Sequence, residues 1–277
     1  VDKVSNSNVA SKKMIFPANK VLCILYSSGG TADVGRHAVR AALDAFPGPI
    51  RVLTKDPATL LEETNWNSGS GPHTFTTEER DRMDVRAVDF ATIDNLSEHV
   101  NDEVGGVISA LGNRQPFFGD RVGHVGTTKL VQAMAKNKVE RLVAITSVGL
   151  NEDWPPMEFH WAGKALKWIF RIGRSNYSDL AKAEVAIRDC DAIDYLLVRP
   201  VGLGEERRPK NEWFLQETKY EGKLGPDMAK LDCARFAVSQ VLEPTFHKRA
   251  IVIGSNPEGF QMTENPPEEE KLETNTN

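Results

Sequence analysis

The stretch SSGGTADVGRHAVR, residues 27–40, decides how this chain is expected to fold. It follows KVLCILY (Lys20–Tyr26), an apolar run of strand length. It leads into Val34–Phe46, where alanines recur at the three- and four-residue spacing of a helix. A Pro-Gly-Pro sequence at 47–49 ends that pattern. A strand, a glycine-rich turn and a helix in this order predict the first βα unit of a parallel sheet.

The glycine loop in this unit has the chemistry of an anion-binding turn. Gly29 permits a tight turn out of the strand, and Gly35 lacks a side chain where the helix must pass close to the sheet. The amide groups from Val34 to Arg36 would point toward a pyrophosphate and gain from the positive end of the helix dipole. Ala32 replaces the middle glycine of a GxxGxxG pattern, and Asp33 adds a negative charge. The loop therefore predicts a dinucleotide site with an imperfect fingerprint.

The second strand indicates which dinucleotide to expect. NAD-binding loops tend to place an acid on the ribose about 20 residues beyond the glycines. In this chain Lys55 stands at that place, and the acid comes one residue later as Asp56. Lys55, together with Arg36, suits a 2′-phosphate, so we expect NADP(H) in preference to NAD(H). The alternative is that Lys55 is an ordinary surface lysine.

The alternation of strands and helices continues along the chain. Further strands are expected at 50–54, 85–88, 104–110, 140–146, 193–198 and 249–254, and helices at 119–137, 178–189 and 232–242, the last capped by Asp232. This order predicts a single Rossmann-type α/β domain over residues 20–254. Its sheet would be parallel and doubly wound, with small substrate-side elements toward the C-terminal end.

Three segments depart from this rhythm. Residues 1–19 are polar and aperiodic, and we expect a flexible leader there. Residues 65–84 contain NSGSGP and are expected to form a loop insertion. Residues 255–277, with PPEEE, are expected to form a disordered acidic tail. The start at Val1 fits either an arbitrary boundary or the end left by a removed targeting segment, so cytoplasmic and organellar (plastid or mitochondrial) locations both stay open.

Composition restricts the kinds of partner. The net charge of −5 argues against nucleic acid, which requires a basic face. No apolar run approaches the roughly 18–20 residues of a transmembrane helix, so a soluble protein is expected. The three cysteines lack CxxC spacing and are expected to be reduced. The six histidines are scattered, and no metal site, P-loop or GxSxG elbow is expected.

Six motifs occur in an order that suggests a family: GGTADVG, VISALG (107–112), RLVAITSVG (141–149), KAE (182–184), YLLVRPVGL (195–203) and LDCARFAV (231–238). Together they resemble the NmrA-like group of atypical short-chain dehydrogenase/reductases. That group includes the flavin reductase/biliverdin reductase B type and plant plastid NAD(P)-binding proteins. The resemblance covers about residues 20–254.

The resemblance implies a set of cofactor contacts. For the pyrophosphate these are Gly29, Gly30, Thr31, Val34 and Gly35; for the 2′-phosphate, Lys55; for the adenine, Asp89 and Phe90; for the ribose, Ser109, Ala110 and Leu111; and for the nicotinamide, Pro200, Val201, Gly202 and Leu203.

Catalytic groups are harder to place. The chain lacks the Tyr-x-x-x-Lys pair of ordinary short-chain reductases, because Tyr177 precedes Lys182 by five residues. Ser147, at a strand's carboxyl end, is the best candidate for a group near the substrate, although it is equally read as a serine that closes the strand. Lys182 matches the KAE motif and could bind a ribose hydroxyl or hold a water, or it could simply be solvated.

Two functions fit these features. The first is an NADPH-dependent oxidoreductase that transfers hydride to a small electron-poor acceptor such as a flavin, a quinone or a tetrapyrrole-like molecule. The second is a non-catalytic NADP(H)-binding scaffold, sensor or assembly subunit. The basic, tryptophan-containing stretch Phe159–Arg174 is open to several interpretations: a peripheral membrane contact, a protein contact, a cover for the substrate pocket, or an amphipathic helix packed on the body.

Overall fold

The computed structural model of the chain describes residues 2–5, 16–27, 34–61, 75–112, 122–153, 174–204, 209–217, 224–225 and 228–256. At residues 2–5, 153 and 174–177 the description covers the backbone alone.

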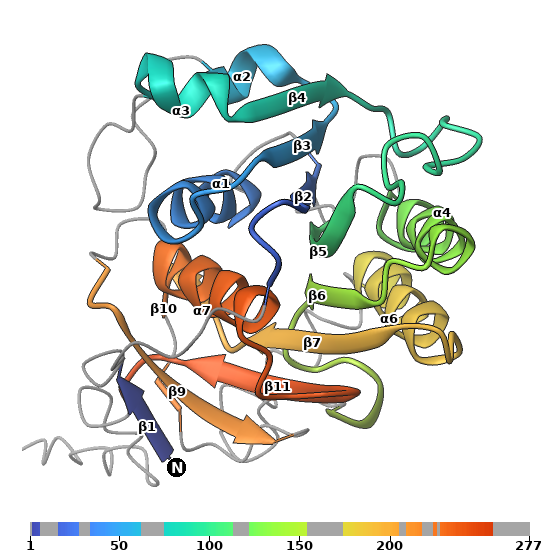
Figure 1. Cartoon of the computed structure of the whole chain (residues 1–277). Coiled ribbons are helices and arrows are strands. Elements are labelled where there is room, and N and C mark those ends of the chain that lie inside the picture. The colour runs from blue at the N-terminus through green and yellow to red at the C-terminus, as the bar shows by residue number, and fades with distance from the viewer. Residues whose placement is uncertain are drawn as a thin grey trace, which may run out of the picture.

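A nine-stranded sheet crosses the molecule in the order β1-β9-β11-β7-β6-β5-β2-β3-β4 (Figure 1). The strands are β1 (Asp2–Ser5), β2 (Val21–Tyr26), β3 (Ile50–Thr54), β4 (Met83–Ala87), β5 (Val104–Ala110), β6 (Arg141–Ile145), β7 (Asp194–Pro200), β9 (Glu212–Glu217) and β11 (Arg249–Gly254). Every neighbouring pair from β4 to β11 is parallel. The chain builds β2, β3 and β4 toward one edge and then returns to build β5, β6, β7 and β11 toward the other. The predicted doubly wound sheet is therefore confirmed.

Helices cover both faces of the sheet. The helices are α1 (Val34–Ala45), α2 (Pro57–Leu61), α3 (Thr77–Asp81), α4 (Val122–Asn137), α6 (Arg174–Arg188) and α7 (Lys230–Leu242), with a 3₁₀ turn, η2 (Asn151–Asp153). Helices α1 and α7 lie side by side on one face, and α4 and α6 lie side by side on the other (Figure 1).

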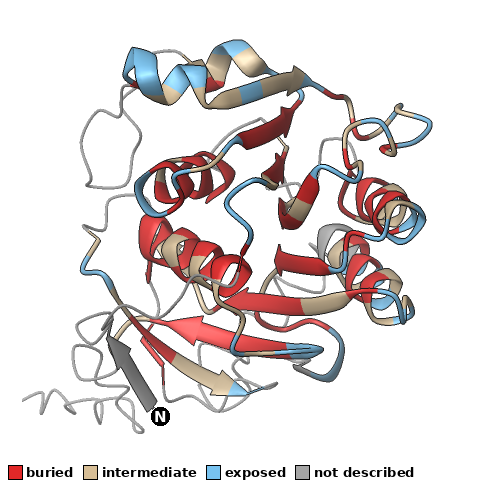
Figure 2. Ribbon diagram, viewed as in Figure 1, coloured by how far each residue is buried: buried red, intermediate tan, exposed pale blue. Residues whose placement is uncertain are grey.

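Strand β2 shows how a single strand contributes side chains to the cores on both faces of the sheet. Leu22 and Ile24 pack into the core beneath α1 and α7, whereas Cys23 and Leu25 pack into the core beneath α4. Because successive strand residues point to opposite faces, a central strand covered on both sides must be apolar throughout, as KVLCILY is. Buried residues accordingly fill the central strands and the helix sides against them (Figure 2).

The sheet has two more strands at one edge than the sequence predicts. Strand β9 pairs antiparallel with β11, and β1 pairs antiparallel with β9. Neither strand was expected, and β1 lies within the segment predicted to be a flexible leader. An antiparallel edge on an otherwise parallel sheet needs no crossover helix, so the strand–helix alternation does not reveal it. A separate pair, β8 (Leu203–Gly204) with β10 (Met228–Ala229), was also not predicted.

Other boundaries differ from expectation. The insertion expected over 65–84 contains α3, which begins with a capping box between Thr76 and Glu79, and the start of β4. Asp232 is not the N-cap of α7. The cap residue is Ala229, and Asp232 lies in the first turn, where its carboxylate accepts backbone hydrogen bonds from Lys210 and Asn211. The acid therefore ties a neighbouring loop to the helix instead of satisfying the helix's own amides.

Gly35 sets the distance between α1 and the sheet. A Cβ atom on Gly35 would lie 2.1 Å from the Cβ of Tyr26, so the helix can approach β2 this closely only without a side chain.

We predict that Gly35→Ala lowers the free energy of unfolding by about 2 kcal/mol or more, because relief of the clash requires a backbone shift. The better helix propensity of alanine offsets only about 1 kcal/mol. The control is Gly112→Ala, whose Cβ would lie 3.5 Å from Leu180, an ordinary contact. Urea unfolding followed by circular dichroism measures both, and equal losses would contradict the assignment.

Candidate functional site

The strand order reverses between β2 and β5, and this reversal marks the candidate site. In open α/β sheets ligands bind outside the carboxyl ends of the strands at such a switch point. Tyr26 and Ala110 are paired at the ends of β2 and β5. Just beyond them the Ser27 hydroxyl donates to the carbonyl oxygen of Gly112 at 2.5 Å, which joins the two segments that leave the sheet.

Part of the glycine loop lies outside the described residues, namely Gly29, Gly30, Thr31, Ala32 and Asp33. The described part begins at Val34 and Gly35, the first residues of α1, which follows β2 as predicted. The Arg36 side chain is buried in this first turn. Its contact with a 2′-phosphate stays a prediction, because the loop residues before Val34 lie outside the described residues.

The adenosine side of the site contains an ion pair. Lys55 follows the last residue of β3, and its ammonium nitrogen lies 3.0 Å from a carboxylate oxygen of Asp89, which follows β4. The hydrogen bond from Lys55 holds the pKa of Asp89 below its usual value. Thus both residues lie where the sequence placed them, but they contact each other.

Asp56, the nearest acid to the expected ribose position, serves a different purpose. Its carboxylate accepts hydrogen bonds from the backbone amide and the hydroxyl of Thr59, at the start of α2. These bonds satisfy an amide that the helix start leaves free. Asp56 is therefore engaged as a helix cap.

The remaining adenine and ribose candidates are mostly core residues. Phe90 and Leu111 are buried in the core beneath α4, and a Cβ on Gly126 of that helix would come within 3.1 Å of both. Ser109 is buried and Ala110 half-buried at the end of β5. The predicted contacts of these residues with adenine and ribose stay predictions.

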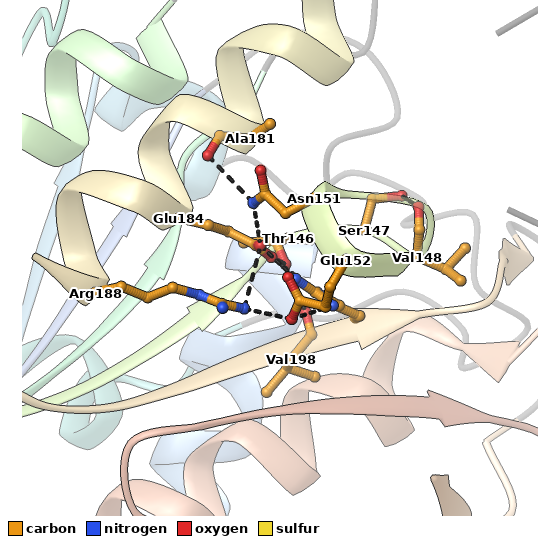
Figure 3. Close-up of polar contacts among 10 residues, drawn as sticks. Thr146, Ser147, Val148, Asn151, Glu152, Ala181, Glu184, Arg188 and Val198 are labelled. Carbon is orange, nitrogen blue, oxygen red and sulfur yellow. Dashed lines mark hydrogen bonds and ion pairs between the residues drawn. The ribbon is translucent and has the colours of Figure 1, made fainter. Parts of the chain in front are cut away.

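On the substrate side, a buried ion pair joins α6 to the sheet. Glu184 of α6 and Arg199 of β7 both have fully buried side chains, and they make two parallel hydrogen bonds, at 3.0 and 2.5 Å. The same carboxylate accepts hydrogen bonds from the Thr146 hydroxyl and the Asn151 amide, each at 2.8 Å (Figure 3). Each oxygen of Glu184 therefore has two donors, which is the satisfaction that a buried charge requires.

A more exposed acid extends this network. Glu152, in η2, lies 2.6 Å from Arg188 and 3.1 Å from Arg199 (Figure 3). Burial alone would lower the pKa of Arg199, but the hydrogen bonds and charges of Glu184 and Glu152 raise it overall. Burial likewise raises the pKa of Glu152, and its bonds to the two arginines outweigh that effect and lower it. Glu152 and Arg199 are therefore both charged near neutral pH.

Ser147 lies directly after the network residue Thr146, at the end of β6. It is half-buried, and its hydroxyl donates to the carbonyl of Val148 at 3.1 Å (Figure 3). The Val148 amide in turn donates to the carbonyl of Pro200, so the ends of β6 and β7 stay together. The expected nicotinamide segment Pro200–Leu203 therefore lies beside Ser147 at the same sheet edge.

Lys182 lies on the opposite side of α6 from Glu184. Its exposed side chain lines a groove of about 400 Å³ between α4 and α6, together with His124 and Asp189. Leu180, one helical turn before Glu184, contacts the positions of Gly112 and Gly123 instead. Lys182 and Glu184 therefore face different directions, because residues two apart on a helix do not share a face, and the role of Lys182 at a bound ribose stays a prediction.

Sequence reasoning missed most of the network. Thr146, Asn151, Glu152 and Arg188 were not singled out. A usable signal was Arg199 itself, a charged residue within the otherwise apolar run YLLVRP, which requires a buried acid as partner. Tyr195, in the same run, packs half-buried against the core.

The described residues bear only in part on the remaining predictions. The stretch Phe159–Arg174 lies outside the described residues except for the backbone of Arg174, where α6 begins. Across the described ranges, no helix combines the length and apolar character needed to span a bilayer. The same ranges contain no cluster of three or more His, Cys, Asp or Glu side chains suited to a metal ion.

The fold and its switch-point site define a dinucleotide-binding α/β protein. The chain belongs to the NAD(P)H-binding family, whose profile matches residues 29–244. This match confirms the resemblance seen in the motifs at the level of an NAD(P)H-binding family. A comparison with curated proteins finds no match.

Solved structures share this fold. A short-chain dehydrogenase/reductase from Veillonella parvula in complex with NADP has a TM-score of 0.61 and 16% identity, with 90% of this chain and 99% of that chain covered. ChuY, an anaerobilin reductase from Escherichia coli, has a TM-score of 0.58 and 14% identity, with 85% and 97% covered. A Rossmann-fold NAD(P)-binding protein from Shigella flexneri has a TM-score of 0.57 and 15% identity, with 86% and 94% covered.

We predict strong coupling between Glu184 and Arg199. Arg199→Met should cost about 3–5 kcal/mol of unfolding free energy, because it leaves a buried carboxylate without its counter-ion. The double variant Arg199→Met/Glu184→Leu should cost clearly less than the sum of the two single changes. Chemical denaturation of the four proteins measures the coupling, and additive losses would show that the pair is not energetically joined.

Proposed function

We propose that the protein is an NADPH-dependent oxidoreductase that passes a hydride to a small electron-poor acceptor. The observation that carries the cofactor choice is the arrangement of charge after β3. Lys55 is a cation beside the expected 2′ position, and the adjacent acid, Asp56, caps α2. An NAD site would instead use such an acid for the ribose hydroxyls.

The described residues fit a dinucleotide laid across the switch point. The backbone amides at the start of α1, from Val34 onward, would hold the pyrophosphate. Gly35 would contribute by allowing the helix to approach β2 closely. The end of β5, Ser109–Leu111, would border the ribose. Pro200–Leu203 and Ser147 would border the nicotinamide, because β6 and β7 end together.

The chemistry follows from this placement. A bound NADPH supplies the hydride, that is, a hydrogen with its electron pair, and the acceptor takes both. Without a Tyr-x-x-x-Lys pair in the sequence, the proton that completes the reduction would come from solvent. The chain's own part would be to orient the two reactants, and the Ser147 hydroxyl could hold a carbonyl oxygen of the acceptor by turning away from the carbonyl of Val148.

Acceptors that stabilise an added electron pair suit this mechanism, because they need little acid catalysis. Flavins, quinones and tetrapyrrole-like molecules meet that condition. The anaerobilin reductase among the structural neighbours supports the tetrapyrrole-like class.

A second candidate is a non-catalytic NADP(H)-binding scaffold or sensor. The exposed position of Lys182 in the groove between α4 and α6 is consistent with such a protein, which needs no catalytic lysine. In that case the nucleotide would bind without any acceptor being reduced.

We predict that Lys55→Ala weakens NADPH binding about tenfold or more, since a charged hydrogen bond contributes about 1.5–3 kcal/mol. NADH, which lacks the 2′-phosphate, should bind with nearly unchanged affinity. The matched control is Lys136→Ala, an exposed lysine in the last turn of α4. Isothermal titration with both nucleotides gives the affinities, and equal effects on NADPH and NADH would reject the 2′-phosphate role.

Turnover separates the two candidate functions. The oxidoreductase should oxidise NADPH, followed at 340 nm, in the presence of a flavin, a quinone or a linear tetrapyrrole. Tight NADPH binding with no oxidation by any of these acceptors would favour the scaffold.

A further inference from the structure

A single carboxylate holds both ends of the segment that carries Ser147. The segment is Thr146–Asn151, which follows β6 and ends at the first residue of η2. One oxygen of Glu184 accepts a hydrogen bond from the Thr146 hydroxyl, and the other accepts one from the Asn151 side-chain amide, each at 2.8 Å (Figure 3). The segment therefore leaves the sheet and returns to the same buried charge.

The sheet itself holds the first part of this segment. The backbone amide of Thr146 donates to the carbonyl of Val198 in β7. The amide of Val148 donates to the carbonyl of Pro200 at the end of the same strand. These backbone bonds fix where the segment starts and connect its middle to the expected nicotinamide segment, which begins at Pro200.

At the far end of the segment, Asn151 reaches from η2 to α6. Its side-chain amide donates to Glu184 and, at 3.4 Å, to the carbonyl of Ala181 (Figure 3). Its φ angle of 48° lies in the left-handed region, which asparagine and glycine adopt more readily than other residues. Asn151 thus combines the backbone of a tight turn with a hydrogen-bond donor that glycine lacks.

We propose that Asn151 is a positioning residue for the nicotinamide side of the site, an inference that rests on the proposed function. By joining the far end of the segment to Glu184, it sets how the segment lies against the ends of β6 and β7. The bond between Val148 and Pro200 carries that placement to the nicotinamide segment. Asn151 acts through these residues and needs no contact with the cofactor.

This role affects one half of the cofactor. The adenosine half would bind at the ends of β3 and β4, away from these contacts, whereas the nicotinamide half would lie beside Ser147 and Pro200. Loss of the Asn151 donor should therefore weaken a ligand that carries nicotinamide and spare one that ends at the adenosine. A general loss of stability would instead weaken both by the same factor, because it acts through the folded fraction.

The test is Asn151→Gly, which suits the positive φ angle and removes the side-chain donor. Glu184 is left in place, because its replacement would also remove the counter-ion of Arg199. NADPH should bind about fivefold more weakly, the scale of one hydrogen bond, while adenosine 2′,5′-bisphosphate should bind with unchanged affinity. Isothermal titration with both ligands measures the ratio.

A second variant checks that the effect passes through Glu184. Asn151→Asp keeps the shape of the side chain but places a carboxylate against that of Glu184, and like charges so close repel. It should weaken NADPH more than Asn151→Gly does. An equal or smaller effect would show that the contact with Glu184 is not the route.

The matched control is Lys138→Gly. Lys138 is also exposed and also has a positive φ angle, 56°, but it lies before β6, at the other end of that strand. The change to glycine in the same backbone conformation should leave the ratio of the two affinities unaltered.

Separate outcomes overturn the two proposals. If both ligands bind the parent protein but Asn151→Gly weakens them equally, leaves both unchanged or matches Lys138→Gly, the positioning role is wrong and the proposed function stands. If neither NADPH nor NADH binds the parent protein, the proposed function fails, and this inference fails with it.

Discussion

The buried contact between Glu184 and Arg199 is the constraint on which the substrate side of the molecule depends. Two opposite charges without solvent are tolerated only when every hydrogen-bonding atom finds a partner. That requirement brings together a helix, two strand ends and the 3₁₀ turn, since Thr146 and Asn151 supply the missing donors. The buried charge therefore holds Thr146 at the end of β6, and Ser147 is the next residue along the chain.

Much of the fold follows from the sequence because parallel strands covered on both faces must be continuously apolar. Strands β3, β5 and β11 begin and end at the expected residues for that reason. Strands β1 and β9 escaped prediction because antiparallel strands added beside β11 need no crossover helix, and β9 is only partly buried. Asp232 was mistaken for a cap because a carboxylate near a helix start can equally bind the amides of a neighbouring loop.

The part of the candidate site that could be predicted consists of residues at the ends of strands, because the strands themselves can be recognised in the sequence. Lys55, Asp89, Ser147 and Pro200 lie at the carboxyl edge of the sheet because each follows or ends a recognisable strand. The match to the KAE motif gives no direction for Lys182, and in the structure it is Glu184, two residues later, that contacts the sheet. The residues around Glu184 come from four separate segments, and only the folded chain brings them together.

Asp56 has a consequence for how cofactor preference in the proposed site can change. In many dinucleotide sites, exchanging a cation for an acid after the second strand is a local event. Here the acid available at that point also starts α2 through its bonds to Thr59. A change that recruited Asp56 to a ribose would leave the first turn of that helix uncapped. A change of this kind in the nucleotide that the proposed site binds would therefore also lower the stability of the first turn of α2.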